Sequence, residues 1–577
     1  MIGISAKRVT VQVWTLADCF AVSLGIRHVS DHCVPLLNNI SKATKRGQFH
    51  DYFVTHLPSS SLHPDSRGPI SPFHKLPRSA SVPHTGEISH SPALLHPLVG
   101  RETTVVRIPL RSAKHHFGVA TSRGTRPANE DAHQAGVLDI PAFAKRAPRS
   151  LTIRRSGASN PPPLENRAAD TASGDPQVFY FGIFDGHGGA ECSNFLRENL
   201  HEYIQCAAAE FELQSSIRQE RRSLPGEAGE AGECTKDELE DTESSQQLLP
   251  IVQRGNSQRI SELERELLDD WRGMVGGYFK RFVPPHFSCL SQKADSTSDA
   301  VDDGDRGVTI EEVMEYAFLR ADLDFVSAQA AKRDDDVVQA DQPLNEDDIL
   351  YSPSQTRSLK IGGRKRFKGG STCSVAMIST PTPAPFWHPA APSSLLISHV
   401  GDTRILLCST TNGLAIPLTS DHHPSSPIEA NRLRRYAATF VTDSFGEERM
   451  SGLANTRAFG DMQSKRIGVS AEPEIKRIEM GPAEYSFLVL MSDGISGTLQ
   501  DQEIVDIVKE AKTPDQGARD VVSFATEVTK EGDNATCLVV RLGGWERRLE
   551  GGVGSMGTKE SREWRRQDAT DPRRSRR

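Results

Sequence analysis

The chain has 577 residues, of which 37% are hydrophobic, and it contains 45 glycines, 35 prolines and a formal net charge of -8. This length could hold several domains, but the low apolar fraction predicts one large folded core with unstructured additions. The acidic balance argues against nucleic acid as the main partner, because binding a phosphate backbone needs a concentrated basic surface.

Simple counts disfavour two further classes of protein. The nine cysteines lie between Cys19 and Cys537 without a C-x-x-C pair, so neither a zinc site nor a disulfide framework is indicated. No run reaches the ~20 apolar residues that cross a bilayer, so we expect no transmembrane segment.

The N-terminal region, residues 1–114, lacks sustained hydrophobic periodicity and is interrupted by Pro and Ser clusters, so we expect it to be disordered. Its Ser, His, Pro and basic side chains outnumber its acids, which fits a mitochondrial presequence, although Asp18 and Asp31 interrupt that pattern. A tail without a targeting role fits the composition equally well, with the cytosol or the nucleus as the alternative location.

The folded domain is expected to span residues 115–543, with order beginning near Phe117. Polar, Pro-rich or acidic composition indicates insertions near 141–177, 208–306 and 334–366, the second of which contains an amphipathic helix over Ser257–Phe279. Residues 544–577 are expected to form a disordered basic tail.

The first strong structural pattern inside this domain is the apolar run Val178–Phe184, which is typical of a buried strand and ends on Asp185. After Gly189, apolar residues from Cys192 to Ile204 recur at helical spacing. Thr309 and Glu312 form a capping box that predicts the start of a further helix.

The later part of the domain contains five more strand-like runs and two helical ones. The Gly401-Asp402 pair between two of the strand-like runs fits a short hairpin turn. Groups of strands separated by helices indicate a layered α+β sandwich. The strand-like runs are 372–378, 395–400, 405–408, 487–491 and 536–542, and the helical runs are 503–509 and 518–528.

Asp185, Asp493 and Asp533 each border a strand-like run, and each is followed by Gly or Asn. An edge where several strands end can bring these acids together, and three close carboxylates repel one another unless a cation is present. Oxygen ligands without a Cys or His cage favour Mg²⁺ or Mn²⁺ over zinc. For any one of these residues, an ordinary turn is the alternative interpretation.

In the ordered blocks, the chain resembles the protein phosphatase 2C family of metal-dependent phosphatases. The resemblance covers most of residues 117–542 and consists of eight motifs in the family's order. These motifs are Arg126–Ala132, Phe184–Gly189, Gly369–Thr372, Val400–Arg404, Leu418–His422, Leu453–Asp461, Ser492–Gly494 and Gly532–Thr536.

This resemblance implies a catalytic domain built as a four-layer α-β-β-α sandwich, with two central antiparallel sheets flanked by helices. It also implies that two metal ions share Asp185, and that a water bridging them attacks phosphorus. Asp493 and Asp533 are expected on one ion, and Glu130 with the Gly186 carbonyl on the other. Asp131 and Asn534 are expected directly behind these ligands, where Asp131 orients a water or a neighbouring side chain.

Two other residues match the family's catalytic positions. Arg126 matches the arginine that grips the phosphoryl oxygens, and His187 matches the proposed general acid for the departing seryl or threonyl oxygen. The implied activity is hydrolysis of phosphoserine and phosphothreonine in phosphorylated protein substrates, by a chain that we expect to be a monomer. A pseudophosphatase that keeps the fold as a regulatory module is the alternative.

One departure from the family pattern concerns a third metal ion. Asp402 matches an acid that helps to hold this ion, but Gly497 stands where the family often has a second acid. With fewer oxygen ligands available, we expect weaker occupancy of the third site.

Overall fold

The computed structural model describes thirteen segments of the chain. Nothing in residues 1–51 falls within them, so the expected presequence lies outside the described residues. The segments are 52–58, 103–109, 115–145, 175–217, 256–287, 308–332, 361–382, 384–434, 440–442, 448–450, 453–529, 532–549 and 556–571.

Two antiparallel sheets form the centre of the described structure. The first has the strand order β13 (Glu474–Met480), β7 (Ser393–Val400), β6 (Gly370–Ser379), β5 (Val178–His187) and β4 (Ala132–Leu138), and β12 (Phe459–Gly460) also pairs with β6. The second has the order β3 (Phe117–Ser122), β15 (Ala535–Arg541), β14 (Tyr485–Met491), β8 (Arg404–Ser409) and β9 (Ala415–Pro417).

Side chains that alternate along each strand build separate cores on the two faces of each sheet. In β5, Phe181 and Ile183 join the core between the sheets, whereas Tyr180 and Phe184 face the helices outside the first sheet. In β14, Leu488 and Leu490 belong to the same central core, and their neighbours face the other way. A face of each sheet is therefore left for helices to cover.

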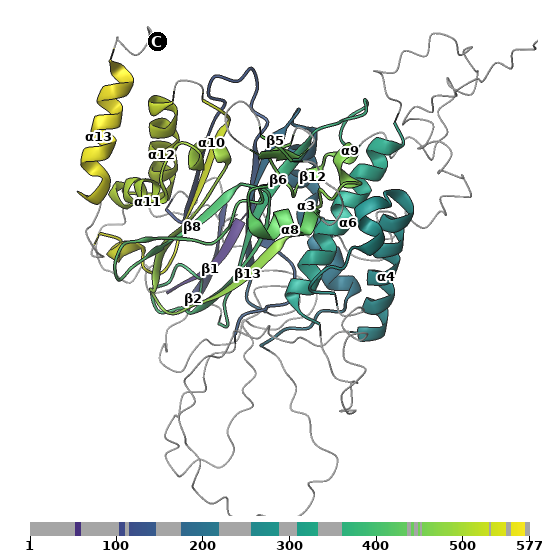
Figure 1. Ribbon diagram of the computed structural model, residues 1–577. Helices are drawn as coiled ribbons and strands as arrows, with labels where there is room; N and C mark the ends of the chain where they lie inside the picture. The colour runs from purple at the N-terminus through teal and green to yellow at the C-terminus, as the bar shows by residue number, and fades with distance from the viewer. Residues whose placement is uncertain are drawn as a thin grey trace, which may run out of the picture. The chain divides into compact units, whose positions relative to one another are not determined.

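The helices cover these outer faces and complete the four-layer α-β-β-α sandwich that the sequence predicts (Figure 1). α3 (Glu191–Glu210), α4 (Ser257–Met274) and α6 (Ile310–Ala330) contribute to the core on the first sheet. α11 (Asp501–Glu510) and α12 (Pro514–Val528) contribute to the core on the second. None of the helices in the described segments has the length and apolar character needed to span a membrane.

Several further elements are short, and one of them begins with the candidate residue Asp493. They are α8 (Pro427–Arg434), α9 (Met462–Lys465), α10 (Asp493–Ser496), β10 (Phe440–Thr442), β11 (Glu448–Met450) and the 3₁₀ helix η8 (Trp545–Arg547).

Residues 256–287 of the second expected insertion pack against the domain. The predicted helix is present as α4, but it ends at Met274, because Gly276 and Gly277 have positive φ values of 64° and 53°. The 3₁₀ helix η5 (Gly277–Arg281) then stacks Phe279 on Trp271 with 4.2 Å between the ring centroids.

The hairpin turn expected at Gly401-Asp402 is wrong. The two residues connect β7 in the first sheet to β8 in the second, so they cross between sheets. β7 is already paired on both sides, with β6 and β13, and has no free edge for β8. The crossing places Asp402 where the two sheets meet.

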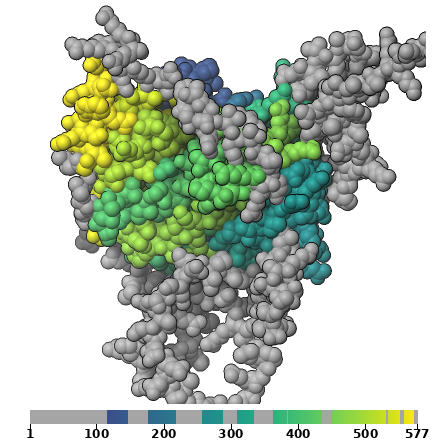
Figure 2. Space-filling model, viewed as in Figure 1, coloured from purple at the N-terminus to yellow at the C-terminus, as the bar shows by residue number. Residues whose placement is uncertain are grey.

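Both ends of the chain contain structure where disorder was expected. β1 (Tyr52–Pro58) and β2 (Thr103–Pro109) form an antiparallel pair rich in β-branched and aromatic residues, whose partners lie too far apart in sequence for local patterns to reveal. In the expected basic tail, α13 (Met556–Thr570) packs on α11 and α12 (Figure 2). Arg562 and Arg565 of α13 form ion pairs with Glu510 and Glu503, at 2.9 and 2.7 Å.

Candidate functional site

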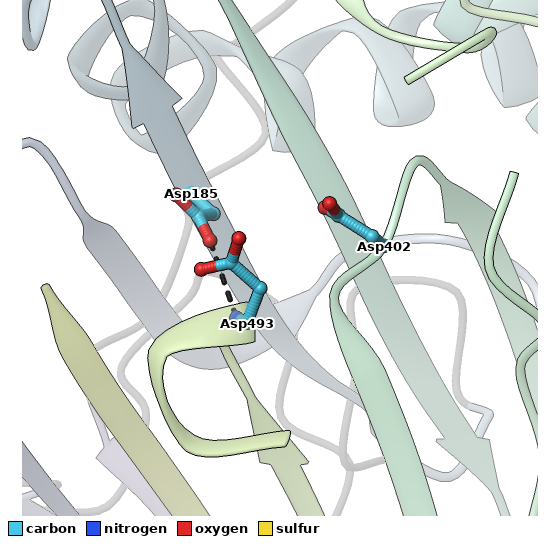
Figure 3. A group of neighbouring side chains, drawn as sticks. All are labelled: Asp185, Asp402 and Asp493. Atoms are coloured by element: carbon cyan, nitrogen blue, oxygen red, sulfur yellow. Dashed lines mark hydrogen bonds between the residues drawn. The ribbon is translucent and has the colours of Figure 1, made fainter. Parts of the chain in front are cut away.

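Three carboxylates from separate elements meet at one edge of the sandwich. Asp185 lies near the end of β5, Asp402 in the crossing after β7, and Asp493 at the start of α10. One carboxylate oxygen from each residue lies within 4.8 Å of the others. Figure 3 shows Asp402 pointing toward the neighbouring carboxylates of Asp185 and Asp493. The backbone N–H of Asp493 also donates to Asp185 Oδ2 at 3.3 Å.

Burial and mutual repulsion make this group of carboxylates resist full ionisation. Burial raises the pKa of Asp185 well above its ordinary value, and the charges of Asp493, Asp131 and Asp402 raise it further. Burial, with repulsion from Asp402, raises the pKa of Asp493 to about 7. A set of hard oxygen donors in this electrostatic state suits a divalent cation such as Mg²⁺ or Mn²⁺.

Asp402 is held differently from its two neighbours. Burial acts to raise its pKa, but hydrogen bonds from His423 and Asn455 outweigh burial and lower it. Asn455 Nδ2 donates to Asp402 Oδ2 at 2.9 Å, and His423 Nε2 lies 3.5 Å from the same oxygen. Asp402 is therefore the member of the group that most readily carries a charge.

The loop that carries Arg126 and Glu130 is fixed by Asn534. The Asn534 Oδ1 atom accepts the Glu130 N–H at 2.7 Å, and its Nδ2 donates to the carbonyls of Arg123 and Ala128 at 3.1 and 3.0 Å. Because one amide holds three points of the loop, Asn534 sets where Glu130 lies relative to Asp533, the residue that precedes Asn534 in the chain.

Asp131, which is expected to support the metal ligands, contacts residues next to the carboxylate group. Its Oδ2 accepts hydrogen bonds from the hydroxyls of Ser492 and Thr536 at 2.9 and 2.7 Å. Burial raises the pKa of Asp131, although these hydrogen bonds oppose the rise. Asp131 thus links the strand that carries Thr536 to the turn that precedes Asp493.

Gly186 allows β5 to approach this loop closely. A Cβ atom at Gly186 would lie 2.5 Å from the Glu130 carbonyl oxygen and 2.9 Å from Ser193 Oγ. A larger residue would push the Asp185 strand and the Glu130 loop apart, so glycine is needed here for packing.

Asp533 and Glu130 lie outside the group of three carboxylates. Asp533 instead accepts a hydrogen bond from Arg126 Nη2 at 2.6 Å, and this contact raises the pKa of the guanidinium. Asp533 still acts on the group, since its charge contributes to the raised pKa of Asp493. The Arg126 side chain is 59% exposed, so it can reach a ligand from solvent.

His187 is paired with an acid that was not among the predicted site residues. Its Nε2 lies 3.0 and 2.9 Å from the two carboxylate oxygens of Asp461. Burial lowers the pKa of His187, but the hydrogen bond and charge of Asp461 outweigh burial and raise it. The imidazole therefore holds its proton more readily than a free histidine.

The hydrogen-bond partners of His187 and Asp402 described above were not predicted from the sequence: Asp461, Asn455 and His423. Asn455 and Asp461 both fall within the quoted motif Leu453–Asp461, but nothing local connects them to Asp402 or to His187. Asp461 and His187 are 274 positions apart, and only the fold brings them into contact.

Proteins similar to this chain in sequence are named as protein phosphatases. A family model described as protein phosphatase 2C matches residues 280–533. The chain is 30% identical over 445 residues to protein phosphatase 2C homolog 4 of Schizosaccharomyces pombe, covering 77% of this chain and 84% of that protein. It is 38% identical over 152 residues to the mitochondrial protein phosphatase 1K of Xenopus laevis, covering 26% of this chain and 40% of that protein.

A solved structure of serine-threonine phosphatase 2C from Toxoplasma gondii also matches, with a TM-score of 0.39 and 15% sequence identity. The match covers 74% of this chain and 94% of that one.

Proposed function

The chain belongs to the protein phosphatase 2C family, and from this premise we propose that it is a metal-dependent protein serine/threonine phosphatase acting on phosphoserine and phosphothreonine. The observation that carries the proposal is the group formed by Asp185, Asp402 and Asp493, with their oxygens within 4.8 Å. In this proposal Arg126 and His187 supply the two other functions that such a reaction needs, and the charges of Asp493 and Asp402 act on them.

The three carboxylates are the residues that would hold divalent cations, with Glu130, Asp533 and the Gly186 carbonyl as further ligands implied by the family resemblance. When bound, Mg²⁺ or Mn²⁺ would acidify the attacking water and offset negative charge on the phosphoryl group. The raised pKa values of Asp185 and Asp493 support this assignment, because carboxylates that repel one another gain most from a cation.

Arg126 binds and orients the phosphoryl group in this proposal. Its guanidinium can offer two parallel N–H donors to two phosphoryl oxygens, which a lysine cannot do. Asn534 supports this role, since it holds the backbone on both sides of Arg126 through the Arg123 and Ala128 carbonyls.

His187 donates a proton to the serine or threonine oxygen as its bond to phosphorus breaks. An alkoxide is a poor leaving group, so this proton transfer lowers the barrier for protein substrates. The contact with Asp461 supports the role, because it favours the protonated imidazole before the reaction.

A phosphatase assay tests the proposal and separates it from a pseudophosphatase module. The purified chain is assayed on a phosphothreonine peptide with Mn²⁺, with Mg²⁺ and after chelation, beside Asp185→Asn and the control Asp269→Asn. Asp269 is an exposed acid of α4. We expect chelation and Asp185→Asn to lower kcat/KM at least roughly 10³-fold, because several kcal/mol of charge stabilisation are lost.

The other outcomes of this assay are equally informative. Activity that survives chelation contradicts the metal-dependent mechanism. A wild-type chain that binds Mn²⁺ but releases no phosphate from the peptide contradicts catalysis and favours the regulatory module.

We also propose a mitochondrial location, from the basic, Ser-rich and acid-poor composition of the N-terminal region. Cell fractionation with an antibody against the chain tests it. Recovery in the cytosolic or nuclear fraction alone would remove this proposal without affecting the enzymatic one.

A further inference from the structure

The pair formed by His187 and Asp461 is asymmetric in its exposure. The His187 side chain is 36% exposed, whereas that of Asp461 is only 4% exposed, so the acid is buried behind the ring. Both carboxylate oxygens of Asp461 lie within hydrogen-bond distance of the same ring nitrogen, Nε2, at 3.0 and 2.9 Å. This geometry leaves Nδ1 as the ring nitrogen that can serve a ligand.

The backbone of Asp461 is held in an unusual conformation by its surroundings. Its φ of 44° is in the left-handed region, which few residues other than Gly, Asn and Asp adopt. Its N–H donates to the Gly369 carbonyl at 2.9 Å, and its own carbonyl accepts the Ser464 N–H at 2.8 Å. At Gly370, a Cβ atom would lie 2.5 Å from Asp461 Oδ2, so glycine there leaves room for the carboxylate.

A buried ion pair supports the segment on either side of Asp461. Lys465 and Asp322 have fully buried side chains whose Nζ and Oδ2 atoms lie 2.5 Å apart. Asp322 also accepts the Gly460 N–H at 2.9 Å, and Lys465 donates to the Ala458 carbonyl at 2.7 Å. Gly460, directly before Asp461, and Lys465, four positions after it, are therefore both tied to Asp322 of α6.

The packed insertion also contacts the end of this segment. The Tyr278 N–H of η5 donates to the Arg466 carbonyl at 3.0 Å. Gly277 makes that contact possible, because a Cβ atom there would lie 2.3 Å from the same carbonyl oxygen. Two separate parts of the fold, α6 and η5, thus fix the segment that presents Asp461 to His187.

We propose that Asp461 is the positioning residue for His187 in the phosphatase reaction, an inference that rests on the proposed function. Its carboxylate accepts the Nε2–H and sets the ring so that Nδ1 faces the departing oxygen. As the attacking water forms its bond to phosphorus, the bond from phosphorus to the serine or threonine oxygen breaks, and its electron pair stays on that oxygen, which takes the proton from Nδ1. The other ring proton stays on Nε2 and remains hydrogen-bonded to the Asp461 carboxylate throughout.

The test uses two substrates that differ in their need for a proton. p-Nitrophenolate leaves without protonation, whereas the alkoxide of a phosphothreonine peptide requires it. Asp461→Asn and Asp461→Gly both tolerate the left-handed backbone. We expect each to lower kcat on the peptide about 10²-fold, within the range of general acid catalysis, and kcat on p-nitrophenyl phosphate less than about fivefold.

Three further measurements separate positioning from a structural defect. On the peptide, Asp461→Asn should add little to the loss in His187→Ala, because the two residues act as a unit. Its thermal midpoint and its Mn²⁺ affinity by calorimetry should match those of the wild type, and Asp269→Asn serves as the surface control.

Equal losses on both substrates, or losses that add fully to those of His187→Ala, would overturn the inference while the proposed function stands. A wild-type chain inactive on the peptide would instead refute the proposed function, and this inference with it.

Discussion

Buried charge is compensated in one region of this molecule and left uncompensated in another. In the segment around Asp461, the fully buried Lys465 pairs with Asp322 at 2.5 Å. The buried Glu429 of α8 pairs with Arg432 and with Arg457, each at 2.7 Å. Burial would raise the pKa of Glu429, but the two guanidinium groups hold it well below its ordinary value. At the strand ends, burial and repulsion instead raise the pKa values of Asp185 and Asp493.

This difference distinguishes supporting charges from charges that bind a ligand. Where acid and base are matched inside the protein, their interactions fix the loop that carries Asn455 and Asp461. Asp185 and Asp493 form no ion pair with a base in the part of the chain that the structure describes, and an external cation can relieve their repulsion. The following predictions use substitutions and pH to test that distinction.

Lys465→Met should produce the largest change in stability. The substitution leaves Asp322 as a buried charge without its cation, and breaking such a pair typically costs about 3–5 kcal/mol of unfolding free energy. Chemical denaturation of the metal-free protein measures it. The double variant Asp322→Leu with Lys465→Met should recover part of the loss, and a single variant as stable as the wild type would show that the pair has no supporting role.

Mn²⁺ affinity should rise with pH through the region near 7. The pKa of Asp493 is raised to about 7, so below that pH the residue holds a proton that competes with the cation. We expect affinity at pH 6 to be at least roughly tenfold weaker than at pH 8, because at least one proton must leave. Calorimetry in buffers of different ionisation enthalpy measures affinity and proton release, and a constant affinity over this range would contradict the account.

The smallest expected effect concerns the third metal ion. Gly497 is exposed at the end of α10, where the family often has an acid. Gly497→Asp should tighten a third Mn²⁺ by about tenfold, through one added carboxylate ligand, while Gly497→Ala controls for backbone effects. Equilibrium dialysis counts the ions, and a third ion held tightly by the wild type would show that Asp402 needs no such partner.

Local sequence patterns predicted a layered α+β sandwich, and the family resemblance implied its four layers. The apolar run before Asp185 and the capping box at Thr309 are local signals, and the structure has β5 and α6 at these positions. The Thr309 hydroxyl accepts the Glu312 N–H at 3.2 Å, as a capping residue should. Hydrophobic periodicity indicates which face of a helix or strand is buried, so it predicts that the elements pack in layers.

Relations between distant elements could not be read in the same way. The Gly401-Asp402 pair has the composition of a hairpin turn, and only the pairing of β7 on both of its edges shows that it crosses between sheets. From the sequence, Asp402 is expected only at a weakly occupied third metal site, because Gly497 stands where a second acid is common, whereas the structure gathers Asp402 with Asp185 and Asp493. The contact between Asp461 and His187 was not predicted, because it depends on tertiary structure alone.

The central claim is that a cation completes the group formed by Asp185, Asp402 and Asp493, and stability as a function of Mn²⁺ tests it most directly. A ligand that binds only the folded state raises the thermal midpoint as its concentration rises. We predict a rising midpoint for the wild type and for Asp269→Asn, and little or no rise for Asp185→Asn. A wild-type midpoint that does not respond to Mn²⁺, or an equal rise in Asp185→Asn, would contradict the account.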